Sequence, residues 1–212
     1  IRISKYEPFV KACEFGSLEI VKYLAILGAD IKTQENLPFK KAVQKSRLEI
    51  VKYLVKIGVD VKSDDNFAVI RASANGDLEM IKFLIDSGAN IRARNDFSFC
   101  KACEYGYLET AKFIAGLGAN ISSNNEYAIK LASQNGHLDV VKYLVSLGAD
   151  IRANTDKAFV LSCKKGHLEI VKYMINLGVD IKSNNYISIR EACRAGNLEI
   201  IKYMISIEPA II

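Results

Sequence analysis

Apolar residues recur along this chain at helical spacing, and the whole pattern returns at a fixed interval. Between residues 48 and 57, apolar side chains cover most of a helix circumference, and charged side chains share the remaining strip. A helix with so wide an apolar surface must be covered on two sides. Leucine stands at 18, 48, 78, 108, 138, 168 and 198, and lysine at 22, 52, 82, 112, 142, 172 and 202. A constant step of 30 residues predicts a protein of stacked repeats.

Each repeat is predicted to contain two helices. In residues 31–60, Asn36 is expected to cap a first helix from about 37 to 45, and the second helix follows from about 48 to 57. Glycine separates the two helices in six of the seven copies, which indicates a backbone with positive φ. Ser46 takes that place in the second copy, so we expect a weaker turn there. A second glycine and a polar connector end each unit.

The string from Gly136 to Tyr143, followed by Gly148-Ala149-Asp150, resembles the ankyrin repeat. The resemblance implies an all-α, helix-turn-helix solenoid of about seven 30-residue repeats, forming a single domain over residues 1–212. The family's usual period is about 33 residues, so the β-hairpin finger is expected to be shortened to a tight loop. Copies of 30 residues with this wording also resemble the ankyrin arrays of giant DNA viruses that infect amoebae.

Charge and cysteine usage limit the alternatives. The net charge is +5, but an acid precedes each of the seven helix lysines by three residues, so these charges largely cancel. No apolar stretch is long enough to span a membrane, so no membrane partner is expected. Cys13, Cys103, Cys163 and Cys193 share one repeat position that predicts small buried residues rather than disulfides. Free thiols favour a cytoplasmic location, in the host cytoplasm if the protein is viral.

The two ends are apolar. Ile1 and Ile3 lie at one end, and Ile207, Ile211 and Ile212 at the other, without the polar face that a terminal repeat needs. The chain starts inside a repeat, so we expect it to be a segment of a longer array. The alternative is oligomerisation, in which the ends join copies of a self-assembling structural component.

No enzymatic chemistry is expected from the sequence. His137 and His167 occupy the same position beside the turn glycine, where a local hydrogen-bonding role explains them. Cys100 and Cys103 resemble a metal or redox pair, but they fall inside a predicted helix and no second pair follows. We therefore expect no catalytic residues, no metal and no cofactor.

Binding of a partner protein is the function that remains. Positions that vary while the framework repeats are free for recognition, and the resemblance implies that those before the turn line a concave groove. Exposed aromatic residues and arginine commonly dominate binding energy, which favours Phe15, Tyr105 and Arg194. The predicted partner-binding residues are Glu14, Phe15, Lys45, Asn75, Glu104, Tyr105, Tyr107, Gln134, Asn135, Lys164, Lys165 and Arg194.

A row of basic residues in the connectors supports a second hypothesis. Its members are Lys32, Lys62, Arg92, Arg152 and Lys182, with Arg2 before them and Ser122 interrupting the row. Unlike the helix lysines, these residues are not accompanied by a column of acidic residues at helical spacing, although Asp30, Asp60, Asp150 and Asp180 lie two residues away. The row is expected to be a solvated edge, and the alternative is binding to nucleic acid or another anionic surface.

Overall fold

The structure is a computed structural model that describes residues 7–121 and 123–209. All regular secondary structure within those ranges is helical. The chain divides into two compact units, Ile1–Lys101 and Ala102–Ile212. The expectation of one domain over residues 1–212 stays a prediction, as do expectations about Ile1, Arg2, Ile3, Ser122, Ile211 and Ile212, which lie outside the described residues.

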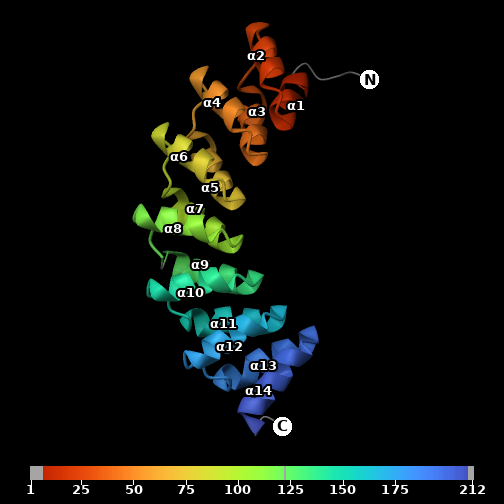
Figure 1. The fold of residues 1–212 in the computed structure, drawn as a ribbon, viewed down its shortest axis with the longest axis vertical. Helices are drawn as coiled ribbons and strands as arrows, with labels where there is room; N and C mark the ends of the chain where they lie inside the picture. The colour runs from red at the N-terminus through yellow and green to blue at the C-terminus, as the bar shows by residue number, and fades with distance from the viewer. Residues whose placement is uncertain (1–6, 122, 210–212) are drawn as a thin grey trace. The chain divides into compact units, whose positions relative to one another are not determined.

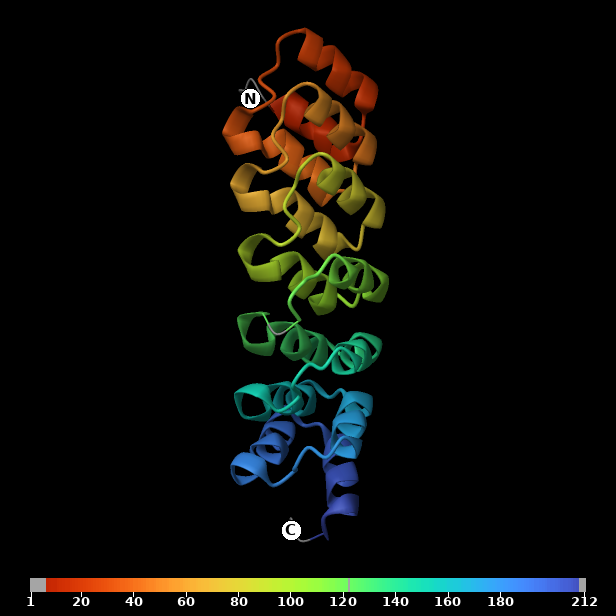
Figure 2. The ribbon, with the colours of Figure 1, turned by 90° about the vertical axis from the view of Figure 1, so that its left-hand side faces the viewer.

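The first unit is built from helix pairs joined by short turns (Figure 1). The first helices of the pairs pack against one another, and the second helices do the same, so that two parallel rows form (Figure 2). Helix α7 begins in this unit and ends in the next. The helices are α1 (Glu7–Phe15), α2 (Leu18–Ile26), α3 (Thr33–Gln44), α4 (Leu48–Lys56), α5 (Ser63–Asn75), α6 (Leu78–Asp86) and α7 (Ala93–Glu104).

The second unit repeats the same arrangement. Helices α9, α11 and α13 form the row of first helices, and α8, α10, α12 and α14 form the row of second helices. The all-α, helix-turn-helix solenoid of about seven repeats is therefore confirmed. The helices are α8 (Leu108–Gly116), α9 (Ser123–Asn135), α10 (Leu138–Ser146), α11 (Ala153–Lys165), α12 (Leu168–Asn176), α13 (Ser183–Ala195) and α14 (Leu198–Ile207).

The turn inside each pair ends the first helix with a left-handed residue. At the end of α5, Gly76 has φ +70° and its N–H donates to the Ser73 carbonyl at 3.2 Å. The next N–H, of Asp77, reaches back to the Ala72 carbonyl at 3.1 Å. These two bonds satisfy carbonyls that the helix end would otherwise leave free. Ser46 adopts the same conformation with φ +53°, as its place in the repeat predicts.

The connectors contain a left-handed helical turn. It stands where the sequence predicted a tight loop in place of the β-hairpin finger. Asp64, Asp65 and Asn66 all have positive φ, between +52° and +63°, at the start of α5. The same three positions are left-handed in α3, α7, α11 and α13. Asn and Asp tolerate this region better than other non-glycine residues, and they fill most of these positions. The described residues contain no β-strand, so the predicted loss of the finger is confirmed.

The predicted helix cap at Asn36 is wrong. Asn36 is the last residue of a left-handed turn, with φ +63°, and its side-chain oxygen is buried without a hydrogen-bond partner. A capping residue would need an extended backbone to aim its oxygen at the first helical N–H groups. The equivalent Asn66 has a different role, because its side-chain oxygen accepts a hydrogen bond from the N–H of Asn90 at 2.7 Å.

The core lies inside each pair and between neighbouring pairs. Large side chains at equivalent positions are almost fully buried, among them Phe9, Phe39, Leu54, Leu84, Ile129, Leu144 and Phe159. A residue at the edge of a unit shows how much of this burial a neighbour supplies. Ile20 on α2 is 52% exposed, whereas the equivalent Ile50 on α4, packed against α2, is 2% exposed. Each repeat therefore depends on its neighbour for part of its core.

Replacing Ser46 with glycine is expected to stabilise the protein. Ser46 has φ +53°, a conformation that glycine adopts without the strain of a Cβ. We expect Ser46→Gly to raise the free energy of unfolding by about 0.5–1 kcal/mol, as measured by urea denaturation. Ser87→Gly is the matched control, because Ser87 has φ −82° and glycine should lower stability there. Changes of the same sign in both variants would contradict this explanation.

Candidate protein-binding surface

The first helices expose one face at positions separated by four, seven and eight residues. On α1 these are Glu7, Lys11, Glu14 and Phe15, and on each later first helix they are the residues 30 positions further along. We call this set the first-helix surface. Residues at these spacings share one side of a helix, so the chain presents a continuous row of side chains within each unit. Eleven of the predicted partner-binding residues lie on it, and Tyr107 lies in the adjoining turn.

Three aromatic side chains on or beside this surface are exposed. Phe15 at the end of α1 is 70% exposed, and Tyr105 and Tyr107 after α7 are 47% and 39% exposed. The core aromatic residues of the same first helices, such as Phe9, are nearly fully buried. An exposed ring offers a large apolar area at little cost in side-chain entropy when a partner covers it. Arg194 on α13 is also exposed.

Glu14 is held between lysines of two consecutive first helices. Lys11 on α1 donates to its carboxylate at 3.1 Å, and Lys41 on α3 approaches it at 3.5 Å. The hydrogen bond from Lys11, and then the charges of Lys11 and Lys41, lower the pKa of Glu14. Glu14 is thus part of an ion network within the chain, so a partner would meet a cluster in which two lysines outnumber the one acid, and not a free acid.

Glu191 forms the corresponding network in the second unit. Its carboxylate accepts from Lys164 on α11 at 3.0 Å and from Arg194 on α13 at 2.5 Å. These contacts lower the pKa of Glu191. Two of the predicted partner-binding cations therefore have a partner already, which the sequence did not indicate because residues 164 and 191 are 27 positions apart. Lys165 and Lys45 are exposed and have no ion pair among the described residues.

Asn75 and Asn135 have a structural role on this surface. The side-chain amide of Asn75 donates to the carbonyls of Val43 and Gln44, both at 3.2 Å, at the end of the preceding first helix. The amide of Asn135 donates to the carbonyl of Glu104 at 2.7 Å. These bonds satisfy helix-end carbonyls. Both residues vary between repeats, so variability alone did not identify this role.

The residue after the turn glycine connects neighbouring pairs. The Nε2 atoms of His137 and His167 lie 3.0 and 2.9 Å from the carbonyl oxygens of Glu104 and Gln134 in the preceding repeat. A carbonyl only accepts, so each Nε2 must carry the donated hydrogen. Asn197 makes the equivalent contact with the carbonyl of Lys164 at 2.9 Å. The hydrogen-bonding role expected for the histidines is present, but it joins repeats rather than stabilising the local turn.

Comparison with known families agrees with this geometry. The family model described as "Ankyrin repeats (3 copies)" matches residues 9–95, 69–155 and 129–211. The chain belongs to the ankyrin-repeat family. Ankyrin repeats generally mediate protein–protein interaction and typically act as scaffolds without enzymatic activity. No curated protein matches the chain. Along residues 7–121 and 123–209, no helix is long and apolar enough to cross a membrane.

The basic connector row differs from its prediction. Arg92 makes a bidentate ion pair with Asp96, with contacts of 2.8 and 3.1 Å, so a helically spaced acid is present after all. Arg152 donates to the carbonyl of Gly178 at 2.6 Å, and Lys182 pairs with Glu208 at 2.9 Å. Lys32, Lys62 and Arg152 are exposed and have no ion pair among the described residues, although Arg152 has the carbonyl contact. Most of the row therefore contributes to the ankyrin framework.

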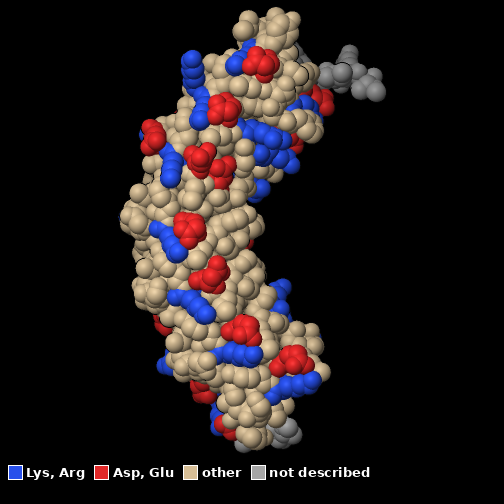
Figure 3. Space-filling view, in the orientation of Figure 1, with Lys and Arg blue, Asp and Glu red and all other residues tan. Residues whose placement is uncertain are grey.

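Charges on the second helices are paired as the repeat spacing predicts. On at least five of these helices the lysine contacts the acid three residues earlier, for example Lys52 with Glu49 at 2.7 Å and Lys172 with Glu169 at 2.7 Å. Lys142 instead lies over the ring of Tyr173. Figure 3 shows these acidic and basic side chains side by side over the second helices. Such exposed pairs contribute little to stability. They also leave little net charge there for an anionic partner.

The cysteines are free, as predicted, and all but one of the four at the shared position are buried. Burial raises the pKa of Cys13 to about 12 and also raises that of Cys163, so these thiols are unreactive at neutral pH. The prediction of a buried side chain is wrong for Cys193, which is exposed. Equivalent cysteines are covered by the following first helix, and no described helix covers α13 in that way.

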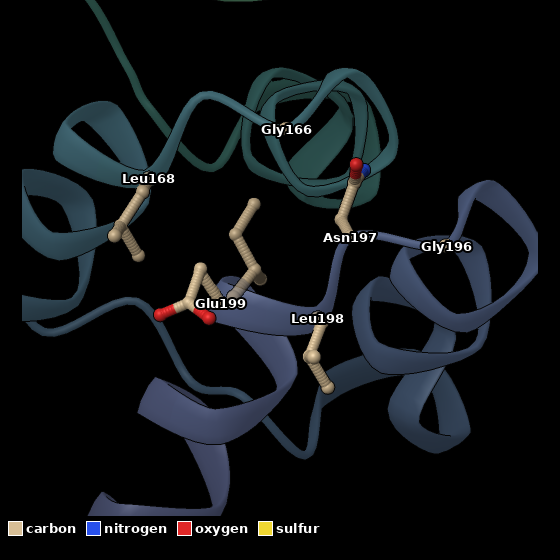
Figure 4. A pocket seen from close by; sticks show the side chains of 7 residues that line it. Gly166, Leu168, Gly196, Asn197, Leu198 and Glu199 are labelled. Carbon is tan, nitrogen blue, oxygen red and sulfur yellow. The ribbon is translucent and has the colours of Figure 1, made fainter.

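The clefts beside the turns contain no catalytic constellation. One of about 350 Å³ is lined by residues of the last two turns, including Gly166, Asn197 and Glu199, and Asn197 points from it toward the preceding helix (Figure 4). A similar cleft of about 240 Å³ lies one repeat earlier, beside His167. Their recurrence indicates a property of the ankyrin turn. The described residues include no group of three or more His, Cys, Asp or Glu side chains that could hold a metal ion.

Replacing Gly136 with alanine is expected to destabilise the protein. Gly136 has φ +86°, and an added Cβ would lie 2.7 Å from the ring of His167, which bonds the preceding helix. We expect Gly136→Ala to lower the free energy of unfolding by at least about 1–2 kcal/mol, as measured by urea denaturation. Gly116→Ala is the control, because Gly116 is helical and its Cβ would meet nothing within 4 Å. Equal losses in both variants would exclude this explanation.

The ion network at Glu14 is expected to make stability depend on pH. Because the folded state lowers the pKa of Glu14 below its ordinary value of 4.5, ionised Glu14 stabilises the fold above that pH. The contribution is lost as pH falls through the lowered folded pKa. Glu14→Gln should therefore be less stable than the wild type at neutral pH, and the two should converge in acid. Urea denaturation over a pH series measures this, and a difference that does not change with pH would contradict it.

Proposed function

We propose that the chain is a non-enzymatic scaffold that binds a partner protein through the first-helix surface and the adjoining turns. The observation that carries the proposal is the exposure of Phe15 and Tyr105 on this surface and of Tyr107 in the adjoining turn. Exposed aromatic side chains are typical centres of binding energy when a partner covers them. The resemblance to giant-virus arrays makes a host protein the partner that we expect, in the host cytoplasm.

The arrangement of charge also favours this function over binding to nucleic acid. Most cations of the connector row are held by Asp96, Gly178 and Glu208, and most second-helix lysines are paired with acids. A nucleic-acid surface needs several cations available to phosphates at once. Nucleic acid therefore remains the alternative that an experiment must separate from protein binding.

Affinity capture from amoebal lysate tests the proposal. The wild-type chain is compared with Phe15→Ala/Tyr105→Ala, and with Leu117→Ala as a control that removes an exposed apolar side chain after α8, away from the first-helix surface. We expect a protein that the double variant loses and the control retains, at low and high salt. Each ring should contribute about tenfold or more in affinity. Retention of nucleic acid only at low salt, equally by all three chains, would contradict the proposal.

The same variants also distinguish partner binding from self-assembly through the apolar ends. Size measured against concentration distinguishes a monomer from an assembling component. Growth in size that Phe15→Ala/Tyr105→Ala does not change would favour the structural alternative over partner binding.

A further inference from the structure

The first-helix surface of the first unit carries a cation at one position of four consecutive first helices. These residues are Lys11 on α1, Lys41 on α3, Arg71 on α5 and Lys101 on α7. The same position in the second unit holds Leu131, Leu161 and Glu191. The first unit has 17 Lys and Arg against 13 Asp and Glu, whereas the second has 12 against 11. The excess positive charge of the chain therefore belongs mainly to the first unit.

The chain itself shows what this row of cations binds. Glu14 places its carboxylate between Lys11 and Lys41, at 3.1 and 3.5 Å, so cations of neighbouring first helices can hold one carboxylate together. In the second unit the acid and the cations exchange repeat positions. Glu191 stands at the position of Lys11, and its carboxylate lies between the cations Lys164 and Arg194. The spacing of these helices therefore suits a carboxylate bridged by two repeats.

One helix further on, the internal carboxylate is missing. The positions equivalent to Glu14 hold Gln44 on α3 and Ala74 on α5, which supply no negative charge. Arg71 is half-buried, makes no ion pair with any described residue, and its Nε is fully buried without a hydrogen-bond acceptor. A desolvated guanidinium N–H without an acceptor is unfavourable. The chain itself covers the Nε, so a carboxylate from outside would meet the remaining part of the half-buried Arg71 side chain, whose charge has no acidic partner among the described residues.

We propose that the first unit binds an extended acidic segment of a partner protein, with one Asp or Glu carboxylate on Arg71. A guanidinium binds a carboxylate through two parallel hydrogen bonds, which gives arginine an advantage over lysine at such a site. A second acidic side chain meets Lys41 on α3 and the exposed Lys45, which directly follows this helix. The proposal rests on the first-helix surface being the protein-binding surface, and it names the chemistry of the partner.

The distance between first helices sets the spacing of the acids. Packed helices lie roughly 8–10 Å apart, and an extended polyproline II peptide advances about 3.1 Å per residue with three residues per turn. Every third residue of such a peptide therefore returns to the same side after about 9.3 Å. Acidic side chains at every third position of the peptide would therefore each lie beside the cation of one first helix, one acid for each repeat.

Fluorescence anisotropy with a labelled peptide of repeated Glu-Pro-Pro triplets tests the proposal on the whole chain. The matched control peptide has Gln-Pro-Pro triplets, which keep the conformation and remove the charge. We expect the acidic peptide to bind and the control peptide not to bind, with affinity falling as salt rises. Arg71→Gln should weaken binding of the acidic peptide about tenfold or more, because it removes a charge-assisted bidentate contact.

A second variant keeps the test decisive if Arg71→Gln fails to fold. Ala74→Glu places an acid three residues after Arg71, as Glu14 follows Lys11, so the chain would occupy its own site. We expect Ala74→Glu to abolish peptide binding, while Ala74→Gln, of the same size without charge, keeps it. Lys32→Gln, in the connector row, should also keep it.

Several outcomes would overturn the proposal without affecting the proposed function. These are equal binding of the two peptides and equal loss in Ala74→Glu and Ala74→Gln. Stronger binding of a single-stranded oligonucleotide than of the acidic peptide would also overturn it, and would favour the nucleic-acid alternative to the proposed function. A captured protein that Phe15→Ala/Tyr105→Ala loses but Ala74→Glu keeps would leave the first-helix surface as the binding surface. Only its preference for an acidic partner would then be excluded.

Discussion

The packing of each helix pair against the next is the interaction on which the rest of the structure depends. A single pair has apolar faces on two sides and can bury only part of them internally. Ile20 and Ile50 are equivalent residues, but only Ile50 has a preceding helix pair among the described residues. The contrast in their exposure shows that burial comes from the neighbouring pair. Stability in such a protein is approximately a sum of repeat and nearest-neighbour terms. The constancy of the 30-residue step follows, because any slip would misalign two successive interfaces.

Hydrogen bonds reinforce the same interfaces at the turns. His137, His167 and Asn197 each reach a carbonyl at the end of the preceding first helix. The glycine of that turn leaves room for the incoming side chain, as the position of the His167 ring against Gly136 shows. Several residue types can make this bond, so the position varies in sequence while its role stays constant. Variation within a repeat is therefore not sufficient evidence of freedom to bind a partner.

The two units differ in the charge that their surfaces present. Acids and bases cancel on the second helices of both, and networks centred on Glu14 and Glu191 neutralise parts of the first-helix surface. The remaining imbalance is concentrated around Arg71 and Lys45 in the first unit. The second unit instead presents the exposed rings of Tyr105 and Tyr107. The same framework thus presents chemically different surfaces, since only the framework positions are fixed by packing.

The sequence by itself determined the repeat length, the helix pairs, the left-handed turn at Ser46 and the ion pairs of the second helices. These depend on contacts within one repeat or on the period, and both can be read from spacing. Only the tertiary structure decided which side chains of adjacent repeats meet. It assigned Asn75 and Asn135 to helix-end carbonyls, paired Lys164 with Glu191, and left Arg71 without an acceptor. Sequence spacing could not give these results, because the partners lie about one repeat apart and their meeting depends on how two helices pack side by side.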